Sequence, residues 1–280
     1  MSLLLFTLVI LLASYVAGLL GAITGLGGGV IIIPVFTLAL HIDLRYAIGT
    51  SLVTAIATSS GSAIAYVKEG ISNIRVGMFL EIATTTGAIC GAALAMYIPT
   101  YIIAIIFGVV LLATVLLSLR KHAASDTGDN TPNKLAARLR LNSTYPAANG
   151  QQIPYTVHRV PGGFFMMLIA GTISGLLGIG SGALKVVAMD TMMKLPFKVS
   201  TTTSNFMIGV TAAASAVVYF QRGYIDPGLS MPVVLGVLAG AFTGTRVLTR
   251  VSTQSLKIVF AIVVGLLSLQ MIYNGVMHKL

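Results

Sequence analysis

The sequence of 280 residues is short of charge, cysteine and tryptophan. Only 9% of its residues are charged, none is tryptophan, and 56% are hydrophobic. Soluble globular domains carry roughly a quarter charged residues, so a soluble class is excluded. The single cysteine, Cys90, has no intrachain partner, which excludes an internal disulfide. Its apolar neighbourhood beside Gly91 favours a packing role over redox chemistry.

Signatures of enzymes and of metal sites are also missing. The sequence has no HExxH motif, no paired-carboxylate motif and no phosphate-binding GxxxxGK(S/T) motif. The histidines fall in or near expected loops and are His41, His122, His158 and His278. We therefore expect a protein that is not an enzyme and that needs neither a cofactor nor a metal.

What the sequence has instead is a series of long apolar runs. Each is close to the ~20 residues that a helix needs to cross a bilayer. The runs cover residues 3–23, 46–67, 76–96, 99–119, 162–177, 199–220, 229–248 and 255–277. No Lys or Arg precedes the first run, so we expect a retained span and not a cleaved signal peptide. The pattern predicts an all-α polytopic membrane protein.

The chain repeats itself at an offset of 153 residues. Glycines and polar residues recur in register, for example Gly27 and Gly180 (180 − 27 = 153), Thr50 and Thr203, and Thr58 and Thr211. Self-similarity of this kind indicates an internal duplication. It predicts a first membrane repeat over residues 1–119 and a second over 162–280. The polar segment 120–161 between them is expected to be a soluble linker.

The basic residues indicate how the repeats are oriented. The linker holds Arg120, Lys121, Lys134, Arg138, Arg140 and Arg159. Basic loops stay on the cytoplasmic side, so the linker should be cytoplasmic. An odd number of crossings in each repeat also places most other basic residues on the cytoplasmic side. An even number divides the basic residues more evenly between the two sides. We therefore expect inverted-topology repeats with both termini outside. The net charge of +10 then reflects topology and not nucleic-acid binding.

A glycine-rich stretch lies at the same place in each repeat. The first, TGLGGGVIIIP, and the second, LGIGSGALKVV, contain Gly25, Gly27, Gly28 and Gly29, and Gly178, Gly180, Ser181 and Gly182. The apolar segments that follow, 30–40 and 183–193, are about 11 residues each, or ~16 Å as helix, which is half a bilayer. Each repeat is therefore expected to contain a broken or half-length helix. Whether these segments are re-entrant or part of a span stays open.

Broken helices at matching places in inverted repeats point to a substrate site near the bilayer midplane. Glycine lets backbone N–H groups converge, and the positive end of the following half-helix dipole would attract an anion. The alternative is that these glycines only let helices approach closely. That packing role is expected for the glycines spaced four apart, which are Gly87, Gly91, Gly240 and Gly244.

Lys185 strengthens the case for an anion. It lies in the apolar run ALKVVAM, where a charged side chain costs at least ~2.5 kcal/mol at bilayer depth. Its charge could be compensated by Asp190, by a bound anion, or by snorkelling to the interface. Asp190 is five residues on, about 140° around a helix, so a direct ion pair has poor geometry.

Other polar residues follow the half-helices or lie inside spans. Hydroxyls and amides can donate to oxyanions without adding charge, although in membrane helices they often bond to carbonyls instead. The candidates are Thr50, Ser51, Thr203, Ser204 and Asn205. Glu81 is a carboxylate inside an apolar run, and with Asp190 it is a candidate for a coupling proton. Alternatively, Glu81 lies near the cytoplasmic interface, because it is only six residues past Arg75.

These motifs resemble a known family. GLGGGVIIIP in the first half, and GIGSGALKVVAMD with VSTTTSNFMIGVTAAASA in the second, look like the sulfite exporter TauE/SafE family of membrane permeases. The resemblance covers both repeats and is weak over the linker. It implies a multi-pass carrier of the cytoplasmic (inner) membrane for sulfite or organosulfur anions such as sulfoacetate, usually exported, with transport coupled to protons. It extends to the glycines of both loops and to Lys185, with Ser181 replacing the glycine found at Gly28.

The combined expectation is a secondary transporter for small oxyanions or sulfonates that works by alternating access. A passive anion channel fits the same physics and would need no coupling carboxylate. A membrane enzyme or scaffold is disfavoured, because few titratable residues lie in the spans and duplicated helix breaks would serve no purpose in a scaffold. The expected partners are a small anion and the lipid bilayer. The sequence leaves open the exact substrate, the direction, the coupling ion and whether the chain forms a homo-oligomer.

Overall fold

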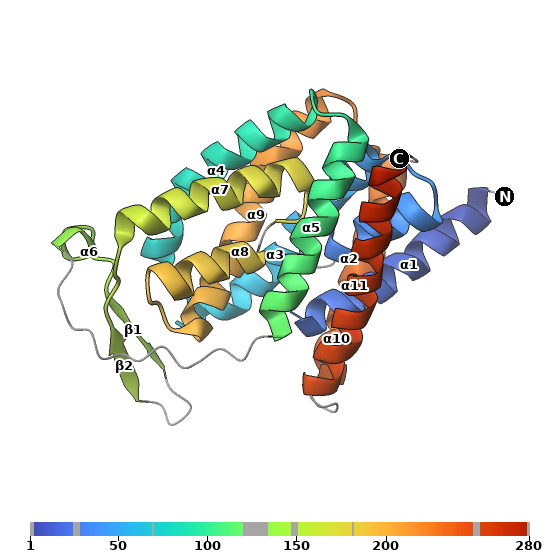
Figure 1. The fold of residues 1–280 in the computed structure, drawn as a ribbon. Coiled ribbons are helices and arrows are strands. Elements are labelled where there is room, and N and C mark those ends of the chain that lie inside the picture. The colour runs from blue at the N-terminus through green and yellow to red at the C-terminus, as the bar shows by residue number, and fades with distance from the viewer. Residues whose placement is uncertain are drawn as a thin grey trace.

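The computed structural model describes residues 3–24, 29–68, 70–119, 134–146, 151–180, 182–248 and 253–278. Within them the chain is almost entirely helical, as expected (Figure 1). The first half contains α1 Leu3–Thr24, α2 Gly29–Pro34, the π-helical segment η1 Val35–Ala39, α3 Leu44–Lys68, α4 Ile74–Ala95 and α5 Thr100–Leu119. The second contains α7 Val160–Leu177, α8 Gly182–Val187, the π-helical segment η2 Ala188–Met192, α9 Phe197–Gln221, α10 Pro227–Leu248 and α11 Thr253–Val276.

The two halves follow the same plan. The bounds of α3 and α9 differ by 153 residues at both ends (197 − 44 and 221 − 68), as do those of α4 and α10. The predicted half-length helices are confirmed: α2 with η1 covers residues 29–39, and α8 with η2 covers residues 182–192. In Figure 1 they lie on opposite sides of the middle of the molecule. The duplication in the sequence is thus a duplication of structural elements.

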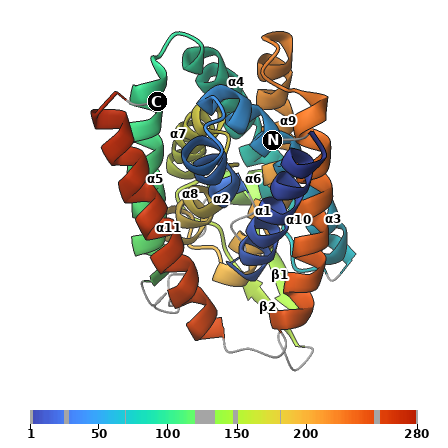
Figure 2. The same cartoon turned by 90° about the vertical axis from the view of Figure 1, so that its right-hand side faces the viewer.

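The halves exchange their fourth helices. α10 of the second half packs along α1 and against α3, and α4 of the first half packs along α7 and against α9. The resulting groups, α1–α2–η1–α3–α10 and α7–α8–η2–α9–α4, are called body A and body B below. The two bodies meet where α3 packs on α9. α5 and α11 pack together as a separate pair, visible on one side of the molecule in Figure 2.

The exchanged helices approach closely because glycine lines the contacts. A Cβ atom on Gly175 of α7 would overlap the carbonyl oxygen of Ala88 in α4, and one on Gly91 would overlap that of Thr172. Gly240 of α10 meets the carbonyl of Tyr15 in α1 in the same way. Small residues allow such backbone contact in membrane bundles. The packing role expected for Gly87, Gly91 and Gly240 is therefore confirmed; of Gly244 no contact is described.

Hydrophobic side chains cover the outside of the bundle. Among the described residues, three helices are long and apolar enough to cross a membrane by length and composition: Ile74–Ala95, Val160–Leu177 and Phe197–Gln221. Large apolar side chains such as Met78, Phe165 and Phe220 are exposed on them. A surface of this kind is stable against lipid chains and not in water. The chain is a multi-pass α-helical membrane protein.

The linker is partly folded. It contains α6 Lys134–Arg138 and an antiparallel hairpin of β1 Ser143–Pro146 and β2 Gln152–Tyr155. Leu141 and Tyr155 are buried in one apolar cluster with residues of α4, α7 and α9. Asn73, the N-cap of α4, donates its amide to the Leu141 carbonyl and to the Tyr155 hydroxyl, at 2.8 Å each. Burial raises the pKa of the Tyr155 phenol, so the phenol keeps its proton.

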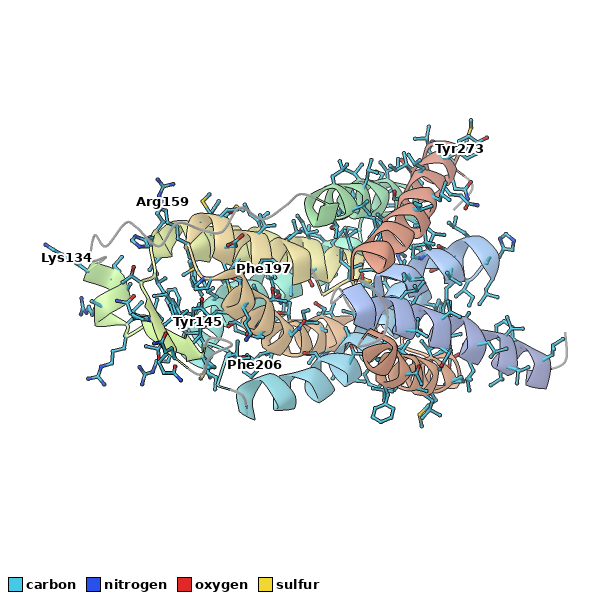
Figure 3. All side chains as sticks on the ribbon, turned by 90° about the horizontal axis from the view of Figure 1, so that it is seen from below. Lys134, Tyr145, Arg159, Phe197, Phe206 and Tyr273 are labelled. Atoms are coloured by element: carbon cyan, nitrogen blue, oxygen red, sulfur yellow. The ribbon has the colours of Figure 1, made fainter. Side chains whose placement is uncertain are left out.

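The linker and the chain ends lie at opposite ends of the molecule. In Figure 1 the N and C marks are at the end away from α6, β1 and β2. Figure 3 places Lys134, Tyr145 and Arg159 together at the linker end, with Tyr273 of α11 far from them.

The glycine contacts give a first prediction. Gly175→Ala should lower the melting temperature in detergent by about 2–10 °C, because overpacking costs about 1–3 kcal/mol where backbone blocks the new methyl group. Gly265→Ala in α11 is the matched control, because nothing lies within 4 Å of a Cβ there. Gel filtration after heating measures both variants. Equal melting temperatures for the two would contradict the close packing of α4 on α7.

Candidate functional site

Each half contains a glycine-rich break between two helices, before α2 in the first half and between α7 and α8 in the second. These two glycine breaks meet in the middle of the fold. A Cβ atom on Gly29, at the start of α2, would lie 3.8 Å from the carbonyl oxygen of Gly178. Ser51 of α3 donates a hydrogen bond of 2.8 Å to that same carbonyl. Gly178 ends α7 with a φ of 68°, a left-handed conformation that favours glycine. One hydroxyl from body A thus holds the glycine break of body B.

The same break is also held from within its own half. Gly180 also has a φ of 68°. Ser204 of α9 donates a hydrogen bond of 3.1 Å to the Gly182 carbonyl at the start of α8. The expected residues Gly25, Gly27, Gly28 and Ser181 lie outside the described residues. Where described, the breaks contribute buried backbone groups at the ends of short helices, which can bind an anion.

The remaining polar candidates make contacts between helices. The Thr50 hydroxyl lies 3.5 Å from that of Ser230 in α10. Thr203, its counterpart, accepts a hydrogen bond of 3.0 Å from the backbone N–H of Asn73, just before α4. The backbone carbonyl of Asn205 accepts a hydrogen bond from the Ser59 hydroxyl, where α3 crosses α9. These three residues therefore hold helices together, whereas Ser51 and Ser204 hold the glycine breaks.

Lys185 is fully buried, with 0% of its surface exposed. Its ammonium donates a hydrogen bond of 2.6 Å to the Thr211 hydroxyl of α9. That hydroxyl donates in turn to Glu81 Oε1 of α4, at 2.7 Å. The alternative of snorkelling is wrong, because the amino group is enclosed by protein. Asp190 lies further along in η2, and its side chain is partly exposed.

Glu81 is buried as well, with 8% of its surface exposed. Its Oε1 atom accepts hydrogen bonds from Thr211 and from Thr85, the latter at 3.0 Å. Its Oε2 atom is buried and has no hydrogen-bond partner within the described part of the chain. A buried carboxylate is costly unless a cation compensates it, and Lys185 faces it across Thr211.

The sequence reasoning missed Thr211 and Thr85. The recurrence of Thr58 at Thr211 is visible in the sequence, but it gives no indication that Thr211 lies between two charged side chains. Among the residues that the structure describes, no cluster of three or more His, Cys, Asp or Glu could hold a metal ion. Chemically, the site offers an ammonium, hydroxyls and backbone N–H groups for an anion, and one carboxylate for a proton.

Comparison with known proteins identifies the family. The model of the family described as "Sulfite exporter TauE/SafE" matches residues 10–271. The chain belongs to the sulfite exporter TauE/SafE family. The TauE/SafE family match spans both glycine breaks, Lys185 and Glu81, so the whole site lies within the matched residues.

Three relatives are similar over nearly their full lengths. The probable membrane transporter protein YunE of Bacillus subtilis is 26% identical, covering 96% of this chain and 98% of the relative. YdhB of the same organism is 25% identical, covering 94% and 100%. MJ0441 of Methanocaldococcus jannaschii is 22% identical, covering 94% of each chain. No solved structure matches the chain. This TauE/SafE protein is a membrane transporter.

The junction of the two breaks gives a second prediction. Gly29→Ala should destabilise the protein, because the new Cβ would overlap the Ser51 hydroxyl. Ser51→Ala alone should cost about 1 kcal/mol through the lost hydrogen bond. In the double variant the methyl group has room, so the two effects should add to less than their sum. Thermal melting of the four proteins measures this coupling, and strictly additive effects would argue against contact between Gly29 and Ser51.

Proposed function

We propose that this protein is a secondary transporter that exports small oxyanions or organosulfur anions, such as sulfite or sulfoacetate, across the inner membrane. The observation that carries the proposal is the meeting of Gly29 and Gly178, which joins the two helix breaks at the centre of a membrane protein. Irregular backbone at membrane depth is tolerated only where it is buried in protein or lines a cavity. The description of the TauE/SafE family as sulfite exporters supports the class of substrate.

The anion is held by groups that can donate hydrogen bonds. These are the backbone N–H groups at the glycine breaks and the ammonium of Lys185, while the hydroxyls of Ser51 and Ser204 hold the breaks through their own hydrogen bonds. Charge-assisted hydrogen bonds to an oxyanion are about twice as strong as neutral ones, so Lys185 supplies the largest share of the affinity. Thr50, Thr203 and Asn205 position the helices that carry these groups.

The repeats are inverted across the membrane, with the linker in the cytoplasm and both termini outside. The basic linker and the location of both chain ends away from it support this orientation. Body A and body B rock against each other at the contact of α3 with α9, and so expose the glycine breaks to one side of the membrane at a time. The Ser51 to Gly178 hydrogen bond then joins the two bodies at the level of the substrate.

Flux in proteoliposomes tests the function and gives the third prediction. The wild type should show saturable flux of labelled sulfite or sulfoacetate. Lys185→Met should reduce it by about tenfold to a hundredfold, because a charge-assisted hydrogen bond contributes about 1.5–3 kcal/mol. Lys198→Met, an exposed lysine at the start of α9, should leave it unchanged.

The flux measured with the wild-type protein alone is enough to test the proposed function. Flux that rises linearly with concentration and never saturates would indicate a channel and not a carrier. Absence of any sulfite or sulfonate flux from correctly reconstituted protein would reject this class of substrate.

A further inference from the structure

The buried side chains of Lys185, Thr211 and Glu81 include hydrogen-bond donors and one acceptor that have no partner among the described residues. An ammonium has three donors, and among the described residues that of Lys185 uses one, on Thr211. A carboxylate has two acceptor oxygens, and Glu81 uses one, while Oε2 has no hydrogen-bond partner in the part of the chain that the structure describes. Buried polar groups are normally hydrogen-bonded, so we expect the remaining donors and the remaining acceptor to bind ligands. An anion fits the free donors, and a proton fits the free oxygen.

The surrounding elements supply little other charge. α7 contains no titratable residue. On η2, Asp190 is partly exposed; on α9, Lys198 is exposed and Tyr219 lies two turns beyond Thr211; on α5, Tyr101 lies in the first turn. On α4 itself, Arg75 is exposed at the first turn. Within the described chain, Glu81 and Lys185 are therefore each other's main buried counter-charge, and a change in one must be balanced at the other.

We propose that Lys185 and Glu81 make this protein an electroneutral carrier that moves one proton with each monovalent anion. The inference rests on the proposed function, since it assigns a co-substrate to the same site. The anion binds to Lys185, and the proton binds to Glu81 Oε2. The empty site holds one positive and one negative charge, and the loaded site holds the ammonium with its anion beside a neutral carboxylic acid.

The balance of charge gives the physical reason. An anion at Lys185 satisfies the ammonium, and Glu81 then loses its compensating cation. The carboxylate takes up a proton from the side to which the site is open, forming the O–H bond of a carboxylic acid, and releases it when the anion leaves. Both states that cross the membrane carry no net charge, which avoids the cost of an unpaired charge in low dielectric. The anion and proton gradients alone then set the direction, and export follows from anion accumulation inside.

Thr211 is the positioning residue of this device. Its hydroxyl accepts from Lys185 and donates to Glu81, so it holds the two charged groups at one site without neutralising either. The first half of the chain has no equivalent set of three side chains. At the same offset of 153 residues, the counterparts of Lys185, Thr211 and Glu81 are Ile32, Thr58 and Val234. Thr58→Val is therefore a matched control for Thr211→Val.

Proteoliposomes with a trapped pH-sensitive dye test the inference and give the fourth prediction. The probe is methanesulfonate, a monovalent anion with no titration near neutral pH. In the wild type, acid outside should accelerate sulfonate uptake several-fold, each anion should bring in one proton, and a membrane potential set with valinomycin should have no effect. Glu81→Gln should carry sulfonate without protons and respond to the potential. Thr211→Val should carry less than one proton per anion, and Thr58→Val should behave as wild type.

The outcomes separate the two proposals. Saturable wild-type sulfonate flux that follows the potential and ignores the pH gradient would overturn electroneutral coupling and leave the transport function intact. Absence of flux of every anion tested would remove both. The wild-type measurements do not depend on the folding of any variant. Glu81→Gln keeps the shape of the side chain, and gel filtration shows whether this variant is folded.

Discussion

The rest of the structure depends on how a fully buried ammonium is compensated. Lys185 has no exposed surface, and the Thr211 hydroxyl connects its ammonium to the Glu81 carboxylate. An isolated charge in this position would cost several kcal/mol, so α4, α8 and α9 have to stay together around it. α4 comes from the first half of the chain and the other two from the second. The exchange of α4 and α10 between the halves is what brings this charge pair together.

The glycines serve this exchange in two ways. Along α4 and α7, and along α1 and α10, they let two helix backbones touch, so each body is a tightly packed unit. At Gly178 and Gly180 they allow positive φ, which ends α7 and lets α8 begin in the interior. These helix-on-helix contacts lie within the bodies, and Gly178 also closely approaches Ile48 of α3 across them. The hydroxyl contacts of Ser51 and Ser59 join one body to the other, and such single hydrogen bonds are weak enough to break during transport.

Much of this architecture could be predicted from the sequence, because a gapless duplication fixes each element twice. The segments 30–40 and 183–193 correspond to half-length helices at 29–39 and 182–192. The partner of Lys185 could not be predicted, since 104 residues separate it from Glu81 (185 − 81) and only the packing of α4 on α9 brings them together. Neighbouring residues on one helix also face different partners: Thr203 contacts the start of α4, whereas Ser204 contacts Gly182. The linker hairpin was not expected, because its short polar strands have little hydrophobic pattern.

The most direct test of the account is the number of protons taken up when the anion binds. Calorimetric titration of the detergent-solubilised protein with methanesulfonate, in buffers of different ionisation enthalpy, measures that number without reconstitution. The account predicts about one proton per anion for the wild type and none for Glu81→Gln, because Glu81 is the group that becomes neutral when Lys185 receives its anion. Tight sulfonate binding by the wild type with no proton uptake would contradict it.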